Sequence, residues 1–334
     1  MAKTIRWGII GCGNVTEVKS GPGFQKAHNS ALVAVMRRNG ELAADYARRH
    51  GVPRWYDDAA ALIADPEVDA VYVATPPSSH KEYTLMAAAA GKPVYVEKPM
   101  AMNHAECQEM IAACAAAGVP LFVAYYRRML PRFRKIKRLI DDGAIGDVRF
   151  VTVRLHQTAR PGHFDPENLP WRVVPEIAGG GIFLDLAAHT LDYLDHFLGP
   201  VASVSGFAGN QAGLYRAEDT VTGSWVYASG VQGAGVWCFD SYTNVDITEI
   251  VGTKGQLTFS SFGDEPVQLT TANGVEEFAI SHPPHIQQPL IQTIVDELNG
   301  EGTCPSTGVS AARTTWVMEQ MIANYYRVAK AMAE

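Results

Sequence analysis

The sequence lacks the residue patterns that mark several classes of protein. Its 334 residues include only five cysteines, and these form neither a Cys-x-x-Cys pair nor a cluster with histidine. Such scattered cysteines are atypical of a disulfide framework or a zinc site and favour reduced thiols in a cytoplasmic protein without a bound metal. The N-terminus has no charged-then-apolar leader, and no apolar run is long enough to cross a bilayer. We therefore expect neither export nor a membrane partner.

The sequence has no excess of positive charge. It contains 28 lysines and arginines against 35 aspartates and glutamates, a formal net charge of -7. Because nucleic-acid binding normally needs a net basic surface, nucleic acid is not expected as a partner. A basic stretch over residues 127–138 is interpreted instead as a solvated helix face. The composition, 47% hydrophobic and 19% charged, is that of a folded globular protein whose length favours two domains.

Short apolar segments alternate with helix-like segments in the first part of the chain. The predicted strands are residues 5–11, 31–36, 70–75, 93–98 and 120–125, and the predicted helices are residues 41–50, 57–64, 80–90 and 104–117. The strands are almost continuously apolar, as parallel strands covered on both faces must be. This alternation predicts an α/β domain, a Rossmann-type doubly wound parallel sheet, over residues 1–124.

The pattern changes after about residue 125. A basic helix over residues 131–142 leads to "GDVRFVTVRLHQ", whose period-two alternation indicates an antiparallel strand. Further strands are predicted over residues 201–209, 220–227, 231–239, 246–251 and 256–260, and a final helix over 309–333 with Ser306 or Thr307 as its N-cap. Residues 125–334 should therefore form an α+β domain with a large, mainly antiparallel open-faced sheet.

A glycine turn directly follows the first predicted strand. "GIIGCGNVT" contains Gly11 and Gly13 in a Gly-x-Gly arrangement, with Asn14 and Val15 at the start of the next helix. Glycine permits the tight turn and lets backbone amides approach a pyrophosphate at the helix N-terminus. The third position of the usual fingerprint holds Thr16 instead of glycine or alanine. The alternative to a nucleotide site is a simple strand-to-helix turn.

The end of the second predicted strand indicates which dinucleotide is bound. NAD-binding domains place an acidic residue there to hold the ribose 2′-hydroxyl, whereas this chain continues as Met36, Arg37, Arg38 and Asn39. A guanidinium group at Arg37 can pair with a 2′-phosphate and stack on adenine, and Arg38 adds positive charge. NADP(H) is therefore the predicted cofactor. A solvated basic turn is the alternative.

Four segments occur in an order and spacing that resemble the Gfo/Idh/MocA family of NAD(P)-dependent oxidoreductases. They are "GIIGCGNVT", "VAVMRR", "ATPPSSHKEYTLMAAAAGKPVYVEKPMA" and "GGGIFLDLAAHTLDYLDHFLG", and together they extend over nearly the whole chain. The resemblance implies that Thr75, Pro76 and His80 lie in the loop that binds the ribose or nicotinamide part of the cofactor. His80 could instead act as a structural cap of the helix that it begins.

The resemblance also explains Glu97, Lys98 and Pro99, which are poor strand residues at the end of an apolar segment. In the family the Lys-Pro peptide is typically cis and the lysine faces the nicotinamide. The resemblance therefore implies that Lys98 is catalytic, donating a hydrogen bond to the substrate oxygen and taking part in proton transfer. Glu97 is expected near the cofactor ribose or nicotinamide.

A second candidate catalytic pair is Asp185 and His189, which share one face of a helix at positions i and i+4. Imidazole suits the transfer of a hydroxyl proton, and the aspartate can contact the substrate or orient the imidazole. The family often has glycine two residues after the aspartate, where this chain has Ala187. Further predicted substrate contacts are Tyr126, Arg127, Trp171 and Arg172.

The leading hypothesis is an NADP(H)-dependent oxidoreductase that moves a hydride between nicotinamide and a carbonyl or carbinol carbon of a sugar or sugar-like polyol. The alternatives are an activity like that of trans-dihydrodiol dehydrogenase, an NAD-dependent glycosidase, and a non-enzymatic NADP-responsive regulator. Because an open-faced sheet needs a cover, we expect a homodimer or homotetramer through the C-terminal sheet.

Overall fold

The computed structural model describes residues 2–333 and divides into two compact units. The first unit comprises the chain up to Leu130 together with His282–Ala312. The second unit comprises Pro131–Ser281 and the chain from Arg313 onward. The chain therefore leaves the first unit, forms most of the second, and returns to the first before it ends in the second.

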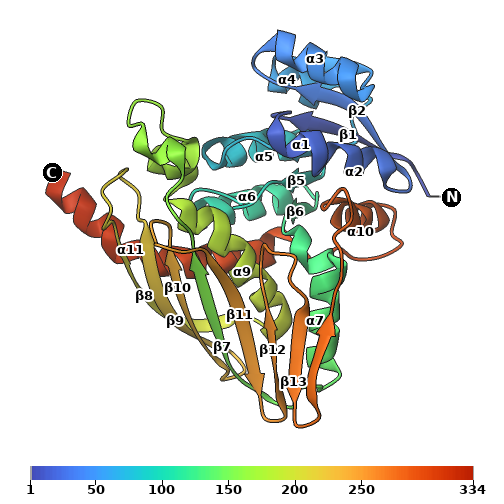
Figure 1. The fold of residues 1–334 in the computed structure, drawn as a ribbon. Coiled ribbons are helices and arrows are strands. Elements are labelled where there is room, and N and C mark those ends of the chain that lie inside the picture. Colours follow the sequence, from blue (N-terminus) through green and yellow to red (C-terminus); the bar gives the residue numbers. More distant parts are fainter. Residues whose placement is uncertain (1, 334) are drawn as a thin grey trace. The chain divides into compact units, whose positions relative to one another are not determined.

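The first unit contains a six-stranded parallel sheet with the order β3-β2-β1-β4-β5-β6 (Figure 1). The strands are β1 (Ile5–Ile10), β2 (Ser30–Met36), β3 (Arg54–Tyr56), β4 (Ala70–Val73), β5 (Val94–Val96) and β6 (Leu121–Val123). This confirms the predicted doubly wound parallel sheet. The strand order reverses between β1 and β4, and ligands of open α/β sheets bind beyond the carboxyl ends of the strands at such a switch point.

The helices of the first unit begin and end at residues with suitable capping chemistry. Asn39, Asp58 and Asn103 each accept a backbone hydrogen bond in the first turn of the helix they precede, and Gly91 and Gly118 follow helix ends with positive φ. The helical elements are α1 (Asn14–Val18), α2 (Gly21–Lys26), α3 (Gly40–His50), α4 (Ala59–Ala64), α5 (His80–Ala89), α6 (His104–Ala116), α10 (Gln288–Leu298) and the short 3-10 helices η1 (Pro77–Ser79) and η2 (Tyr126–Met129).

Residues 282–312, which return to the first unit, are bonded to β6 and η2. Thr307 forms an antiparallel bridge with Phe122, and the neighbouring Ser306 donates its hydroxyl to the Val123 carbonyl at 2.7 Å. In addition, Arg128 donates to the Pro305 carbonyl at 2.7 Å. The first unit therefore ends at Leu130, six residues after the domain border predicted at 124/125. The prediction also placed residues 282–312 in the second domain, whereas in the structure they belong to the first unit.

The second unit contains an eight-stranded sheet with the order β14-β13-β12-β11-β7-β10-β9-β8. All neighbours pair antiparallel except β7 and β10, so the predicted mainly antiparallel sheet is confirmed, although β7 is parallel to one of its neighbours. The strands are β7 (Val148–His156), β8 (Val201–Gly209), β9 (Thr220–Tyr227), β10 (Gln232–Cys238), β11 (Val245–Gly252), β12 (Gly255–Phe259), β13 (Val267–Thr271) and β14 (Gly274–Phe278).

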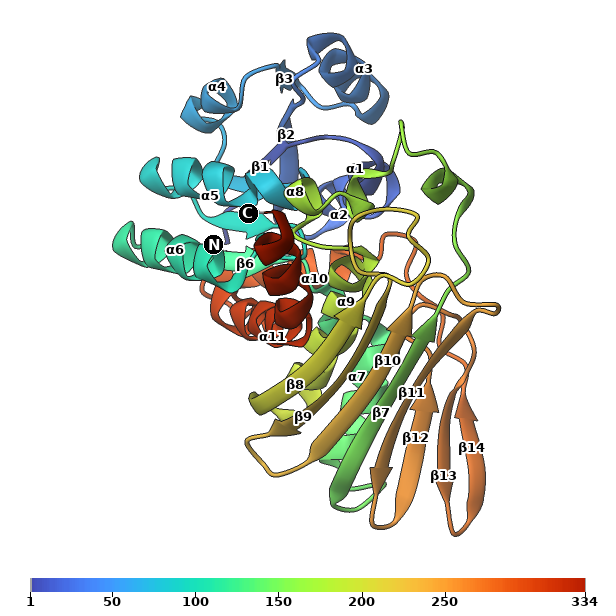
Figure 2. The same cartoon turned by 90° about the vertical axis from the view of Figure 1, so that its left-hand side faces the viewer.

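One face of this sheet is covered by helices, and Figure 2 shows α7 and α9 behind the strands. The helical elements are α7 (Pro131–Asp141), η3 (Pro161–Phe164), η4 (Trp171–Val173), α8 (Pro175–Ala178), α9 (Ile182–Leu198) and α11 (Gly308–Ala333). A Cβ atom on Gly206 or Gly223 would lie 2.8 Å from atoms of Met321, so these glycines let α11 approach β8 and β9 closely. Thr307 caps α11 through reciprocal hydrogen bonds with Ser310.

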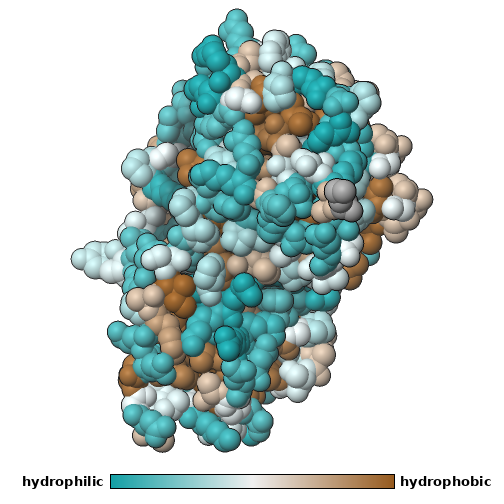
Figure 3. Space-filling model, turned by 90° about the vertical axis from the view of Figure 1, so that its right-hand side faces the viewer, coloured by the Kyte–Doolittle hydropathy of each residue, from teal (hydrophilic) through white to brown (hydrophobic). Residues whose placement is uncertain are grey.

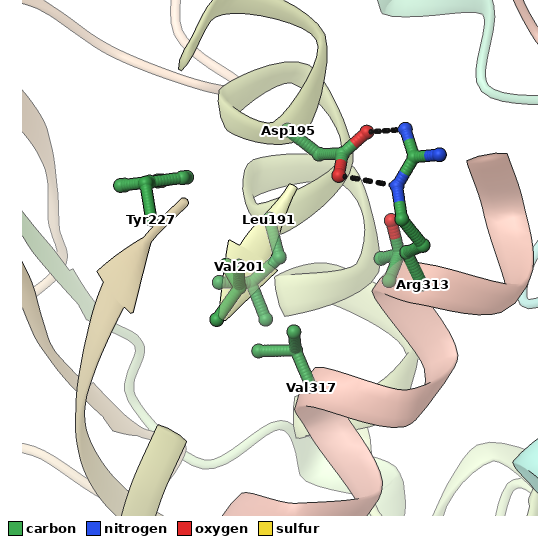
Figure 4. Close-up of a pocket in the computed structure, with 7 residues that line it drawn as sticks. Leu191, Asp195, Val201, Tyr227, Arg313 and Val317 are labelled. Carbon is green, nitrogen blue, oxygen red and sulfur yellow. Dashed lines mark hydrogen bonds and ion pairs between the residues drawn. The ribbon is translucent and has the colours of Figure 1, made fainter. Parts of the chain in front are cut away.

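Helices α9 and α11 are also joined by an ion pair beside a small pocket (Figure 4). Asp195 on α9 accepts two hydrogen bonds from the Arg313 guanidinium on α11, at 2.9 and 2.6 Å. The remaining lining side chains are mainly apolar, among them Leu191, Tyr227 and Val317. This pocket contains none of the predicted site residues.

The surface in Figure 3 is hydrophilic over most of the face shown, with separate hydrophobic areas. Within residues 2–333, no helix combines the length and the apolar character needed to cross a membrane. Among the same residues, no group of three or more His, Cys, Asp or Glu side chains is arranged to hold a metal ion.

Candidate active site

The glycine turn after β1 is built by close backbone packing. Gly11 has φ +91°, and a Cβ atom there would lie 2.7 Å from Thr75 Cγ2, so only glycine fits. Its amide donates to the Met36 carbonyl at 2.9 Å, which joins the turn to the end of β2. The turn thus brings together the carboxyl end of β1, the carboxyl end of β2 and the loop that follows β4.

Thr16, at the unusual third position of the fingerprint, bonds to the turn itself. Its hydroxyl accepts from the Gly13 amide at 3.0 Å and donates to the Gly13 carbonyl at 2.8 Å. The amides of Asn14 and Val15 occupy the first positions of α1, where no partner within the helix exists. A Cβ atom on Gly13 would meet only the Gly11 carbonyl oxygen, at 3.9 Å, so the space beside the turn is open. These features fit a dinucleotide pyrophosphate.

Arg37 and Arg38 follow β2 and are both exposed. The Arg37 amide donates to the Tyr56 carbonyl of β3 at 3.2 Å. Neither guanidinium forms an ion pair with a side chain in the part of the chain that the structure describes. Asn39 uses its side chain to cap α3, so no carboxylate occupies the end of β2. The donor set at this position suits a phosphate better than a ribose hydroxyl.

The loop after β4 contains Thr75, Pro76 and His80. The Thr75 hydroxyl accepts from Ser79 at 2.8 Å. His80 is fully buried, with Nε2 2.7 Å from the Thr75 carbonyl oxygen and Nδ1 3.0 Å from the Pro99 carbonyl oxygen. Burial lowers the pKa of His80. Since the ring has no exposed surface, its position favours the structural alternative, in which His80 joins the Thr75 loop to the turn that carries Lys98.

Glu97, Lys98 and Pro99 follow β5 directly, and the Lys98–Pro99 peptide is cis. The Glu97 carboxylate is 7% exposed and accepts hydrogen bonds from neutral donors. Its Oε1 accepts from Tyr72 at 2.5 Å and from Gln287 at 2.7 Å, and its Oε2 accepts from the Lys98 amide at 3.1 Å. The Lys98 side chain is half-buried. The Glu97 carboxylate is therefore hydrogen-bonded in place at the carboxyl edge of the sheet.

The predicted substrate contacts of the first unit lie in η2, just after β6. Tyr126 and Arg127 are both buried. Arg127 donates to the Tyr126 hydroxyl at 3.1 Å, and its guanidinium carbon lies 5.2 Å from the centre of the Tyr126 ring. The structure thus pairs these two residues with each other at the same edge of the sheet as the Lys98 turn.

In the second unit, Asp185 and His189 lie one turn apart on α9. Asp185 accepts a hydrogen bond from Arg172 Nε at 3.0 Å, and the Arg172 guanidinium carbon lies 4.3 Å from the centre of the Trp171 ring. His189 is buried, and its ring contacts Phe262 edge-on with the centroids 6.0 Å apart. The structure therefore brings Trp171, Arg172 and Asp185 together, and His189 follows Asp185 one turn further along α9.

Glu218 fixes the N-terminus of α9, and sequence reasoning did not find this residue. Its two carboxylate oxygens accept from the Gly181 amide at 2.9 and 3.0 Å, and Tyr326 donates to it at 2.6 Å. A Cβ atom on Gly181 would lie 2.4 Å from the Glu218 carbonyl oxygen, which explains the glycine at this position. Burial raises the pKa of Glu218 to about 7. No motif marks Glu218 in the sequence.

A parallel sheet with a glycine turn at its switch point defines a dinucleotide-binding domain. Comparison with protein families agrees. Residues 5–125 match the model of the oxidoreductase family with an NAD-binding Rossmann fold, and residues 133–258 match the Gfo/Idh/MocA C-terminal domain. The chain belongs to the Gfo/Idh/MocA family of oxidoreductases, which confirms the resemblance.

Individual relatives align over nearly the whole chain. Oxidoreductase P35 of Formosa agariphila is 40% identical over 319 residues, which are 96% of this chain and 98% of that protein. The 1,5-anhydro-D-fructose reductase of Ensifer adhaerens is 30% identical over 310 residues and 91% of each chain. Among solved structures, aldose-aldose oxidoreductase from Caulobacter crescentus complexed with glycerol has a TM-score of 0.85 at 26% identity, with 98% of each chain covered.

Proposed function

We propose that the protein is an NADP(H)-dependent oxidoreductase acting on a carbonyl or carbinol carbon of a sugar or sugar-like polyol. The observation that carries this proposal is the hydrogen-bonded Glu97–Lys98–Pro99 turn after β5, which places a half-buried lysine at the carboxyl edge of the nucleotide-binding sheet. The names of the Ensifer reductase and the Caulobacter aldose-aldose oxidoreductase support a sugar as substrate.

The proposed cofactor contacts lie at the switch point of the sheet. Gly11, Gly13, Asn14 and Val15 would hold the pyrophosphate, because the turn is open and the first amides of α1 are available. The exposed guanidinium groups after β2 would hold the 2′-phosphate and so select NADP(H). Thr75, Pro76, Glu97 and Lys98 would line the nicotinamide side. The bound nicotinamide would supply or accept the hydride.

The protein's own groups would handle the oxygen of the substrate and its proton. Lys98 Nζ would donate a hydrogen bond to the oxygen that changes between hydroxyl and carbonyl. His189 would accept the hydroxyl proton during oxidation and return it during reduction. Asp185, held by Arg172, would orient the substrate hydroxyls. Tyr126, Arg127 and Trp171 are the remaining proposed substrate contacts.

We also propose that the chain forms a homodimer or homotetramer through the sheet of the second unit. Phe150 on β7, Phe207 on β8 and Val236 on β10 are exposed by 43%, 72% and 37%. Apolar side chains on an open sheet face are typical of a contact between subunits. Light scattering should detect a dimer or tetramer that Phe207→Glu weakens. A wild-type monomer at all concentrations would contradict the proposal.

Turnover assays test the enzymatic proposal directly. Purified protein is given NADPH or NADH with a panel of keto-sugars, osones and dicarbonyls, and NADP⁺ or NAD⁺ with sugars and polyols, beside Lys98→Met. We expect NADPH-linked turnover of at least one sugar-like compound, and a loss of about 100-fold or more in kcat for the variant. NADPH binding without any turnover would instead favour the regulator, and glycoside cleavage with retained NAD would favour the glycosidase.

A further inference from the structure

We propose that Gln287 is a positioning residue that fixes the Glu97 carboxylate and through it the Lys98 turn. This inference deepens the proposed function and rests on it. Gln287 precedes α10 in the segment that returns to the first unit, 190 residues away from Glu97 in the sequence. It is fully buried, and its Nε2 donates to Glu97 Oε1 at 2.7 Å.

The direction of the Gln287 amide is set by Tyr95. The Tyr95 hydroxyl donates to Gln287 Oε1 at 2.9 Å, so the nitrogen of the amide must face Glu97. Burial raises the pKa of Tyr72 and Tyr95 well above the ordinary value, which keeps both hydroxyls protonated as donors. The hydrogen bonds therefore run in one direction, from Tyr95 to Gln287 and from Gln287 and Tyr72 to Glu97.

This arrangement leaves Oε2 as the functional oxygen of Glu97. The two side-chain donors both bind Oε1, whereas within residues 2–333 the donor to Oε2 is the Lys98 amide. A carboxylate offers about four acceptor positions, so Oε2 retains a position for a hydroxyl or amide donor of a ligand. Gln287 thus binds Oε1 of Glu97 inside the protein, and Oε2 lies beside the Lys98 amide at the carboxyl edge of the sheet.

The Gln287 backbone also connects Glu97 to the cofactor turn. Its amide donates to the Lys19 carbonyl just after α1, at 3.2 Å. The neighbouring His285 places Nδ1 2.8 Å from the Val18 carbonyl oxygen. A Cβ atom on Gly23 would lie 3.0 Å from Ile291, so α2 and α10 are closely packed. The helix after the glycine turn and the Lys98 turn therefore share one support.

The first test is a double-mutant cycle in thermal stability, which needs no turnover. Gln287→Leu in the wild-type chain leaves a buried carboxylate short of a donor and should lower Tm by about 4 to 8 °C. In a Glu97→Leu background no carboxylate is left short of a donor and only the Tyr95 hydroxyl loses its acceptor, so the same change should lower Tm by at least about 2 °C less than in the wild-type chain. Equal Tm shifts in the two backgrounds would overturn the proposed hydrogen bond.

The second test measures positioning in catalysis. Gln287→Leu should reduce kcat by roughly 10- to 100-fold with KM for substrate changed less than about threefold, because misplaced groups mainly affect the transition state. Gln292→Leu is the matched control, since Gln292 lies in α10, the helix that Gln287 precedes, and among the residues that the structure describes its side chain bonds to His28 and Asp296. It should leave kcat unchanged. An unaffected kcat in folded Gln287→Leu would overturn the positioning role.

A third variant keeps the proposal testable if Gln287→Leu cannot be obtained in folded form. If Gln287→Leu does not fold, Tyr95→Phe keeps Gln287 and removes only the hydroxyl that orients its amide. We expect a smaller loss of kcat, about three- to tenfold, at unchanged NADPH affinity; no loss would contradict the inference. If the wild type turns over no substrate, the proposed function fails, and the stability cycle, repeated with Tyr95→Phe where needed, still decides whether Gln287 holds Glu97.

Discussion

Glu218 should make the stability of the second unit fall as pH rises. The carboxyl group is fully buried and bonds to the Gly181 amide and the Tyr326 hydroxyl, and burial raises its pKa from 4.5 to about 7. A folded-state pKa above the unfolded value means that folding favours the protonated form. The contribution to stability is therefore fully present below about pH 4.5 and is lost as pH rises through about 7.

The size of this effect follows from the shift. At about 1.4 kcal/mol per pKa unit, the protein should lose roughly 2 to 3 kcal/mol of unfolding free energy between pH 5 and pH 8 through this group. Glu218→Gln preserves the shape and one acceptor for the Gly181 amide but cannot ionise. The Tm of the variant relative to the wild type should therefore rise by about 5 to 10 °C over this pH range.

Differential scanning fluorimetry at several pH values between 5 and 8 measures this difference. Glu176→Gln is the matched control, because Glu176 is an exposed glutamate that pairs with Arg216 and whose pKa is lowered. Because its pKa is lowered in the folded state, the ionised Glu176 stabilises the fold at high pH, which is the opposite of the effect of Glu218. The Glu176→Gln variant should therefore not gain stability relative to the wild type as pH rises. Parallel Tm curves for the wild type and Glu218→Gln would show that ionisation of Glu218 does not affect stability and would contradict this prediction.

Two further predictions concern charged side chains. Arg37→Asp should shift the ratio of kcat/KM for NADPH over NADH by roughly 10- to 100-fold toward NADH, because the proposed charge-assisted contact with the 2′-phosphate would be lost and repulsion added; an unchanged ratio would remove the basis for proposing NADP(H). Asp195→Asn should cost about 1 to 3 kcal/mol in urea unfolding, because it leaves Arg313 without its bidentate partner. The exposed pair of Lys137 and Asp141 is the comparison, and Asp141→Asn should cost under about 0.5 kcal/mol.

The sequence determined the elements that have strong local signals. The apolar segments of β1, β2, β4, β5 and β6 are long enough to be recognised as strands from the sequence alone. Glycines or capping residues mark the ends of the intervening helices. The short strand β3 contains exposed Trp55, and β14 is mostly exposed, so neither shows a hydrophobic pattern. Helix α10 does have one, since Leu290, Ile291, Ile294 and Val295 form a buried face with helical spacing, and it could have been predicted.

Short sequence motifs also identify the candidate groups, namely the glycine turn, the arginines after β2, the Glu97–Lys98–Pro99 turn and the pair on α9. The residues that hold these groups in place became evident only from the fold. Gln287 and Glu97 are 190 residues apart, and Glu218 and Gly181 are 37 residues apart, so no local pattern joins them. Buried polar groups require partners, but folding chooses those partners from any segment that reaches the same place. The candidate site residues can therefore be identified from short sequence motifs, whereas the residues that hold them in place depend on long-range packing.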